Sequence, residues 1–179
     1  MTRPNLLERY QARRTRRFEL FAERWAPLLP RWRTRRRRRL LVVALATIFL
    51  ALAVVAALIA CGLERGPLLW APVCLVFFPL WISLQIVSGR QADAPVGALD
   101  EWELEQRNAA RSVGLTLTQT LAMIPAIWLV VVGGFTDLGN IRAAYAGGLM
   151  LLTALLVGGC APTMILAWIR PDTEPEDER

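Results

Sequence analysis

Residues 35–63 read RRRRRLLVVALATIFLALAVVAALIACGL, five arginines followed by 24 residues that carry no charge. A helix needs about 20 apolar residues to cross the hydrocarbon core of a bilayer. Three more uncharged stretches follow, at residues 66–89, 112–136 and 143–169. The sequence therefore predicts an all-α fold, a four-helix transmembrane bundle. Its spans are expected at about 40–63, 67–88, 113–135 and 143–169, all within one membrane domain of residues 40–169.

The composition argues against a catalytic role for this chain. It has 179 residues, 55% of them hydrophobic, a net charge of +6 and no His. His is the commonest general base and the commonest transition-metal ligand in proteins. The sequence also has no Gly-rich phosphate loop, no metal-ligand cluster and no nucleophile beside a base. We therefore expect a non-enzymatic protein that binds no cofactor.

The N-terminal segment, residues 1–39, carries 14 arginines. Leu7, Tyr10, Phe18, Phe21 and Trp25 recur at multiples of three and four residues. This spacing is typical of a basic amphipathic helix that lies on a membrane surface. The arginine run that follows should contact anionic phospholipid headgroups, which are a nearer counter-charge than nucleic acid. The residues of this predicted lipid contact are Arg35, Arg36, Arg37, Arg38 and Arg39.

The arginines are distributed unequally between the two sides of the membrane. Nineteen fall on the side of the N-terminus, which with four spans is also the side of the acidic tail at 170–179. Only Arg65 and Arg142 fall on the other side. Because cytoplasmic loops carry the excess of basic residues, we expect a bacterial plasma-membrane protein with both termini in the cytoplasm.

One alternative would remove the first span. Leu58-Ile59-Ala60-Cys61 matches the lipobox of bacterial lipoproteins, and cleavage there would leave Cys61 lipidated. The apolar run before it is longer than the 7–15 residues of a usual signal core. It is also preceded by 39 residues with their own amphipathic pattern. We therefore prefer an uncleaved span.

The loop between the second and third spans contains a well-formed helix start, Leu99-Asp100-Glu101-Trp102-Glu103-Leu104. Asp100 can cap the helix, with Glu103 in the capping-box position. This predicts a cytoplasmic helix at about 100–112 that continues into the third span, with an ion pair between Glu103 and Arg107. The helix either sets the geometry of the loop or docks a partner protein. The candidate docking residues are Trp102, Asp100, Glu103 and Arg107.

This loop also carries a resemblance. Ala98-Leu99-Asp100-Glu101, then Glu105-Gln106-Arg107-Asn108 and a span, is similar over about 20 residues to small multi-pass membrane proteins common in actinobacteria. The Arg-only basic residues and the Ala- and Leu-rich composition fit such a source. The resemblance implies a membrane location and a cytoplasmic loop, and no particular activity.

The spans contain no charged residue, but the third carries a polar stripe. Ser112, Thr116, Gln119 and Thr120 fall on one helix face, and Gln85 lies at a similar depth in the second span. Polar groups in lipid are expected to face the interior of a bundle. We expect them to form interhelical hydrogen bonds or a small polar pocket. The paired glycines of the fourth span predict either that it packs most closely or that it carries a face for dimerisation or for a partner helix.

Two hypotheses for function follow. The first is an accessory, scaffolding or regulatory subunit of a larger plasma-membrane complex, which implies a membrane-protein partner. The second is a small transporter or channel, in which several copies of the chain surround the polar stripe. Uncharged spans argue against a proton-coupled pump, because ionisable residues usually mark such pathways.

Overall fold

The computed structural model describes residues 34–63, 65–95, 99–135 and 141–171, with a few isolated positions between residues 12 and 32. Within these ranges the chain forms four long helices and a short 3-10 helix, η2 (Gln91–Asp93), with no strand, which confirms the all-α fold. The long helices are α2 (Arg35–Ala60), α3 (Gly66–Val87), α4 (Glu101–Phe135) and α5 (Ile141–Ile169). The amphipathic helix expected in residues 1–39 and the acidic tail fall mostly outside the described residues.

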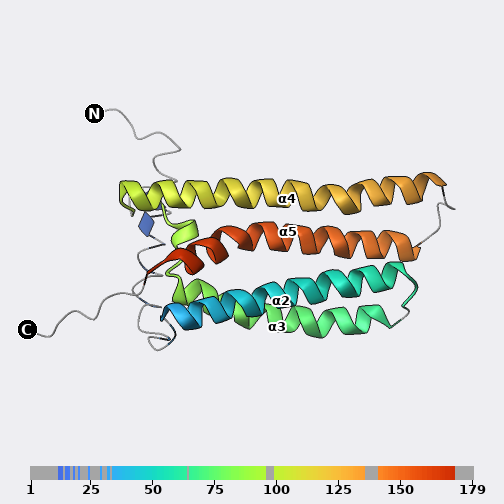
Figure 1. Ribbon diagram of the computed structural model, residues 1–179, viewed down its shortest axis with the longest axis horizontal. Helices are drawn as coiled ribbons and strands as arrows, with labels where there is room; N and C mark the ends of the chain where they lie inside the picture. Colours follow the sequence, from blue (N-terminus) through green and yellow to red (C-terminus); the bar gives the residue numbers. More distant parts are fainter. Residues whose placement is uncertain are drawn as a thin grey trace, which may run out of the picture.

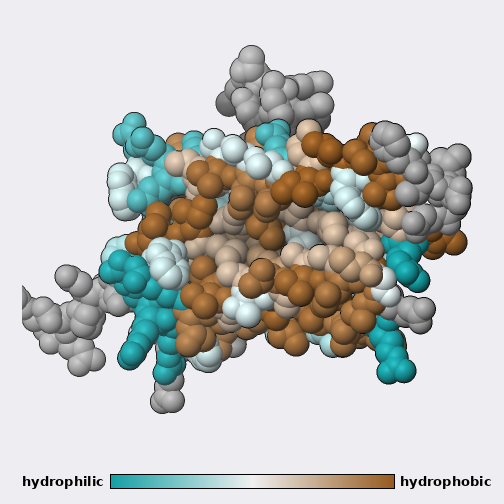
Figure 2. Space-filling model, turned by 45° about the vertical axis from the view of Figure 1, so that its right-hand side comes forward, coloured by the Kyte–Doolittle hydropathy of each residue, from teal (hydrophilic) through white to brown (hydrophobic). Residues whose placement is uncertain are grey.

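All four long helices have the length and composition to cross a membrane. They contain 26, 22, 35 and 29 residues. On the face shown in Figure 2, apolar side chains cover most of the length of the molecule and hydrophilic ones gather towards the two ends. The chain is thus a multi-pass membrane protein.

The helices lie side by side in the order α4, α5, α2, α3 (Figure 1). The central helix, α5, packs extensively against both α4 and α2, while α3 packs mainly on α2. Among the four helices α5 is the most buried and α4 the least. This confirms the fourth span as the most closely packed. The arrangement is an open layer, in which one side of α4 has no neighbour among the other described helices.

The core is formed mainly by α2, α3 and α5. Leu45 and Leu52 of α2 and Leu84 of α3 are fully buried. The ring of Phe77 lies 5.8 Å from that of Phe49, which joins the two helices in the middle of the core. In the described core clusters, α4 contributes the buried Ala110, and its partly buried Trp128 packs against a second cluster. Close backbone approach to α5 also holds α4 in place.

That approach depends on glycine. A Cβ atom added to Gly114 would lie 2.8 Å from Cγ of Pro162, and one added to Gly158 would lie 2.8 Å from Cα of Thr118. Neither distance is tolerated by a real side chain. Helices in lipid gain dispersion contacts when small residues let their backbones come together. The α4–α5 interface is of this kind.

Four helix ends meet at one end of the layer. Arg35, Val87, Glu101 and Ile169 lie there together, and the α2–α3 and α4–α5 connections lie at the opposite end (Figure 1). Because α4 is one continuous helix of 35 residues, it is about 52 Å long. The hydrocarbon core is about 30 Å thick, so the first turns of α4 extend beyond it.

Candidate functional site

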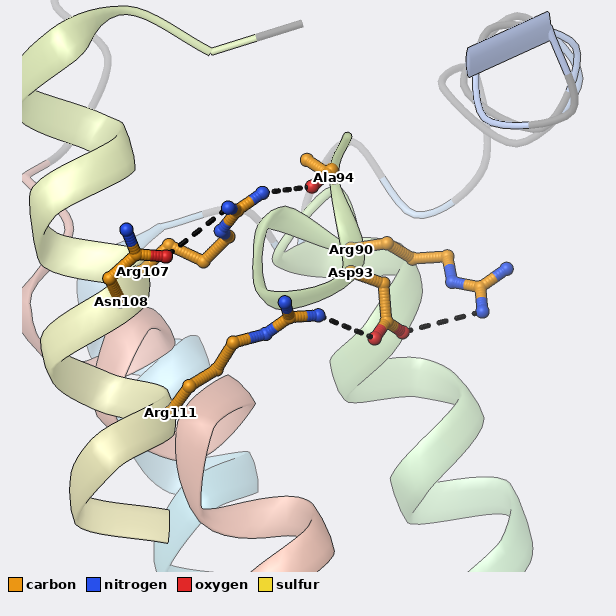
Figure 3. A network of polar contacts seen from close by, with 6 residues as sticks. All are labelled: Arg90, Asp93, Ala94, Arg107, Asn108 and Arg111. Carbon is orange, nitrogen blue, oxygen red and sulfur yellow. Dashed lines mark hydrogen bonds and ion pairs between the residues drawn. The ribbon is translucent and has the colours of Figure 1, made fainter. Parts of the chain in front are cut away.

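The connection between α3 and α4 folds back onto α4 through a polar network (Figure 3). The helix α3 ends at Val87 and is followed by Gly89 and Arg90, whose φ angles of +64° and +52° reverse the chain direction. The carboxylate of Asp93 then lies between two arginines, 3.4 Å from Arg90 and 4.0 Å from Arg111 of α4. These half-exposed pairs tie the loop to α4.

Arg107 is the buried part of this network, with only 5% of its surface exposed. Its guanidinium donates hydrogen bonds to the carbonyl of Ala94 and to the side chain of Asn108 (Figure 3). A buried charge that holds a loop carbonyl in this way is a structural anchor, because its removal would leave the carbonyl without a partner. Arg107 is therefore inaccessible to a docking partner.

The start of α4 is capped as the sequence predicted. The Asp100 carboxylate accepts a hydrogen bond from the backbone N–H of Glu103 at 2.7 Å, which satisfies one of the first N–H groups of the helix. The predicted Glu103–Arg107 ion pair is wrong. Glu103 instead accepts a hydrogen bond from the amide of Gln91 at 3.2 Å, because Arg107 turns inward to the loop. Both Asp100 and Glu103 thus serve the helix and its loop.

Trp102 differs from these neighbours. It is 62% exposed, on the first turn of a helix that the loop network holds in place. Of the four candidate docking residues, it is the one that presents a large apolar surface. Tryptophan is enriched among residues that dominate protein interfaces.

A second junction joins α2, α5 and α3 at the same end. Arg38 is 3% exposed and donates from Nη2 to the carbonyls of Arg170 and Pro171, at 2.7 and 2.8 Å. Arg170 in turn donates to the carbonyl of Ser88 at 3.2 Å. The final carbonyls of a helix have no partner within the helix. Arg38 supplies a hydrogen-bond donor for the carbonyls at the end of α5.

The five arginines predicted to contact lipid headgroups therefore divide into different roles. Arg38 is buried against protein carbonyls, which corrects its assignment to lipid. The guanidinium of Arg39 lies 4.7 Å from the centre of the Trp168 ring, and that of Arg37 lies 5.5 Å from the centre of the Trp32 ring. The remaining two, Arg35 and Arg36, are exposed.

The polar stripe of α4 does not point where we expected. Ser112, Thr116, Gln119 and Thr120 are all exposed, on the side of α4 that faces away from α5. Glycine contacts turn the opposite side towards α5, and Thr116 satisfies its own hydroxyl by donating to the carbonyl of Ser112 at 3.1 Å. Gln85 is partly buried on α3, which has little contact with α4. The five residues do not form one cluster within a single chain.

This outward direction brings Trp102, one of the candidate docking residues, onto the same face as the polar stripe. Starting at Trp102, exposed residues recur every three or four positions along α4, which is the repeat of a single helix face. We call this the outer face of α4, made of Trp102, Glu105, Ala109, Ser112, Val113, Thr116, Gln119, Thr120, Met123 and Ile127. Its first turns lie beyond the span and its remainder lies inside it.

The sequence interpretation missed several residues of these junctions, among them Asp93, Gln91 and Arg170. Arg38 continues the buried stripe of α2, which runs from Leu41 and Val42 through Leu45 to Ile59. Because residues 40–63 are uncharged and largely apolar on every side, this stripe does not stand out in the sequence. Partners such as the carbonyls of Ala94 and Ser88 have no side-chain signal. They required the folded chain.

Within the described part of the chain, no group of three His, Cys, Asp or Glu residues could hold a metal ion. Comparisons with protein-family models, with curated proteins and with solved structures give no match. The class of protein rests on the helices: a multi-pass membrane protein with four candidate spans.

Proposed function

We propose that this chain is a non-enzymatic accessory, scaffolding or regulatory subunit of a bacterial plasma-membrane complex. A partner membrane protein would dock along the outer face of α4. The observation that carries this proposal is the continuity of that face, which joins the exposed Trp102 to the polar stripe. The orientation we propose, with the arginine-rich end in the cytoplasm, rests on the arginine count and the positive-inside rule.

The position of Gln119 supports a partner inside the membrane. It lies eight residues after Arg111, about 12 Å further along the helix. In the described part of the chain its amide has no hydrogen-bond partner. Burial of an unpartnered amide in an apolar medium costs about 2–7 kcal/mol. A neighbouring helix with a polar side chain at this depth would remove that cost, and Trp102 would add an anchor outside the span.

The test combines purification with crosslinking in the native membrane. We expect the chain, isolated in mild detergent, to carry one membrane protein in fixed stoichiometry. Trp102→Ala and Gln119→Leu should each lower the yield of that protein about tenfold, the loss expected when a contact worth roughly 1.4 kcal/mol is removed. Trp32→Ala, at an exposed tryptophan outside α4, should leave the yield unchanged.

A photo-crosslinker at Val113 should reach the same protein, whereas one at Leu75 of α3 should not, although Leu75 is 71% exposed and Val113 53%. A chain that always runs alone, or crosslinks that form equally from both positions, would overturn the proposal.

A small oligomeric transporter or channel is the second candidate, and the outward direction of the polar stripe is the observation that favours it. Copies of the chain arranged about one axis would place Ser112, Thr116, Gln119 and Thr120 around a shared path. Pure protein in liposomes should then pass a solute. Gln119→Leu should reduce the flux, with Gln85→Leu on α3 as the matched control. Liposomes that stay tight across a broad solute panel would rule this candidate out.

A further inference from the structure

An open apolar groove runs between α2 and α4 on the surface of α5. It consists of two adjoining hollows of about 450 Å³ each, which share Phe49 of α2 and Val157 of α5. The groove exists because α2 and α4 both pack on α5 and make little contact with each other. Its lining is almost wholly apolar, so a bound molecule must offer hydrocarbon to it.

The side of α2 that lines the groove begins with a charge. Val42, Ala46 and Phe49 line the first hollow. Their spacing of four and three residues places them on one helix face, and Arg39, three residues before Val42, starts the same face. The Arg39 guanidinium is held over the ring of Trp168, which itself lines the first hollow. A cation is therefore fixed at the mouth of a hydrocarbon groove.

Arg39 has bonding capacity left. The residue is partly exposed, and no carboxylate in the described ranges pairs with it. The surroundings also favour an anion. The helix α2 begins with five arginines, has no acidic residue in its first turn and receives no side-chain cap from Thr34. The positive end of a helix dipole repels cations and attracts anions, so an anion beside Arg39 would be stabilised.

We propose that the groove binds one phospholipid with an anionic headgroup, its phosphate on Arg39 and one acyl chain along α2. The dimensions agree. From Arg39 to Phe49 is ten residues, or about 15 Å of helix. One leaflet of the hydrocarbon core is also about 15 Å thick. The acyl chain would thus fill the first hollow and end near the second. This site is separate from the outer face of α4 and does not depend on the proposed function.

Native mass spectrometry of the full chain tests the headgroup contact. The protein is reconstituted in an equimolar mixture of phosphatidylcholine and phosphatidylglycerol and released in mild detergent. We expect one retained phosphatidylglycerol in preference to phosphatidylcholine. Arg39→Gln should lower retention about fivefold, the effect of roughly one basic residue at an anionic surface.

Arg37→Gln is the matched control. It removes the same charge and a second arginine–tryptophan stack, but Arg37 lies two residues away, on the other side of the helix. Retention should be unchanged. Equal losses from Arg37→Gln and Arg39→Gln, or equal retention of both lipids, would show only a general attraction to this end and overturn the proposal.

A second pair of variants tests the acyl chain. Ala46→Phe fills the first hollow from an exposed position, so it should leave the fold intact and displace the lipid. Ala71→Phe, at an exposed position on α3 outside the groove, should have no effect. Full lipid retention in Ala46→Phe, or a groove filled by a co-purifying protein with no phosphatidylglycerol bound, would contradict the proposal.

Discussion

Gly158→Ala is expected to lower the free energy of unfolding by about 3 kcal/mol, the upper part of the range for an overpacked core. A Cβ atom at this position would lie 2.6 Å from Cβ and 2.8 Å from Cα of Thr118, and would overlap its Oγ1. A flexible side chain could move aside, but the Cα of Thr118 belongs to the backbone of α4. The two helices must therefore separate, and their contact between Gly114 and Pro162, one turn away, would open with them.

The neighbouring glycine provides the control. Gly159 is exposed, and a Cβ atom there would meet nothing within 4 Å. Both substitutions gain the same helix propensity, about 1 kcal/mol in favour of Ala, so the difference between them isolates the contact with Thr118. Unfolding in mixed micelles with increasing dodecyl sulfate measures both variants. If Gly158→Ala is as stable as Gly159→Ala, the close α4–α5 approach described here is wrong.

Gly158 and Gly159 also show how much of the fold could be predicted from the sequence. Uncharged runs of more than 20 residues identified four spans, because few soluble elements need that much continuous apolar length. The glycine pairs marked the fourth span as closely packed. They could not show which member of each pair makes the contact, since Gly147 and Gly158 meet α4 while Gly148 and Gly159 meet nothing. That choice depends on how α5 is rotated between its neighbours.

The polar stripe was placed wrongly for a related reason. Hydrogen bonding favours an inward direction for Ser112, Thr116 and Gln119, and close packing of Gly114 favours the opposite side of α4 as the contact. The sequence contains both signals, but it does not show which of them decides the side of α4 that faces α5. In the structure the glycine side packs, and the threonine hydroxyls bond to carbonyls of their own helix.

The arginine run is the clearest case of residues that look alike in the sequence and act differently. Arg35 and Arg36 are exposed, as expected for contact with headgroups. Arg38 and Arg39 differ because a helix turns 100° per residue and carries them to the packed side. Arg38 continues the buried stripe of α2 and Arg36 does not, but that stripe is visible only in the folded chain because residues 40–63 are largely apolar on every side.

Arg38→Met is expected to lower the free energy of unfolding by about 2–3 kcal/mol, since it removes two hydrogen bonds from a charged donor, each worth about 1.5–3 kcal/mol before relaxation. The bonds go to the carbonyls of Arg170 and Pro171 at the end of α5. Methionine keeps much of the apolar part of the arginine side chain, so the stability that is lost comes mainly from the hydrogen bonds. The loss should be local at first, with the last turn of α5 fraying and the bond from Arg170 to Ser88 weakening.

Arg36→Met separates this role from a general effect of charge. It removes the same charge from the same turn of α2, but Arg36 is exposed. Hydrogen–deuterium exchange followed by mass spectrometry should show faster exchange over residues 160–171 in Arg38→Met and no change in Arg36→Met. Equal destabilisation by the two substitutions would mean that attraction to headgroups, which both arginines would share, stabilises this end of the protein, and that the hydrogen bonds to α5 do not. Faster exchange confined to Arg38→Met would show that a buried arginine at the start of the first span fastens the end of the last one.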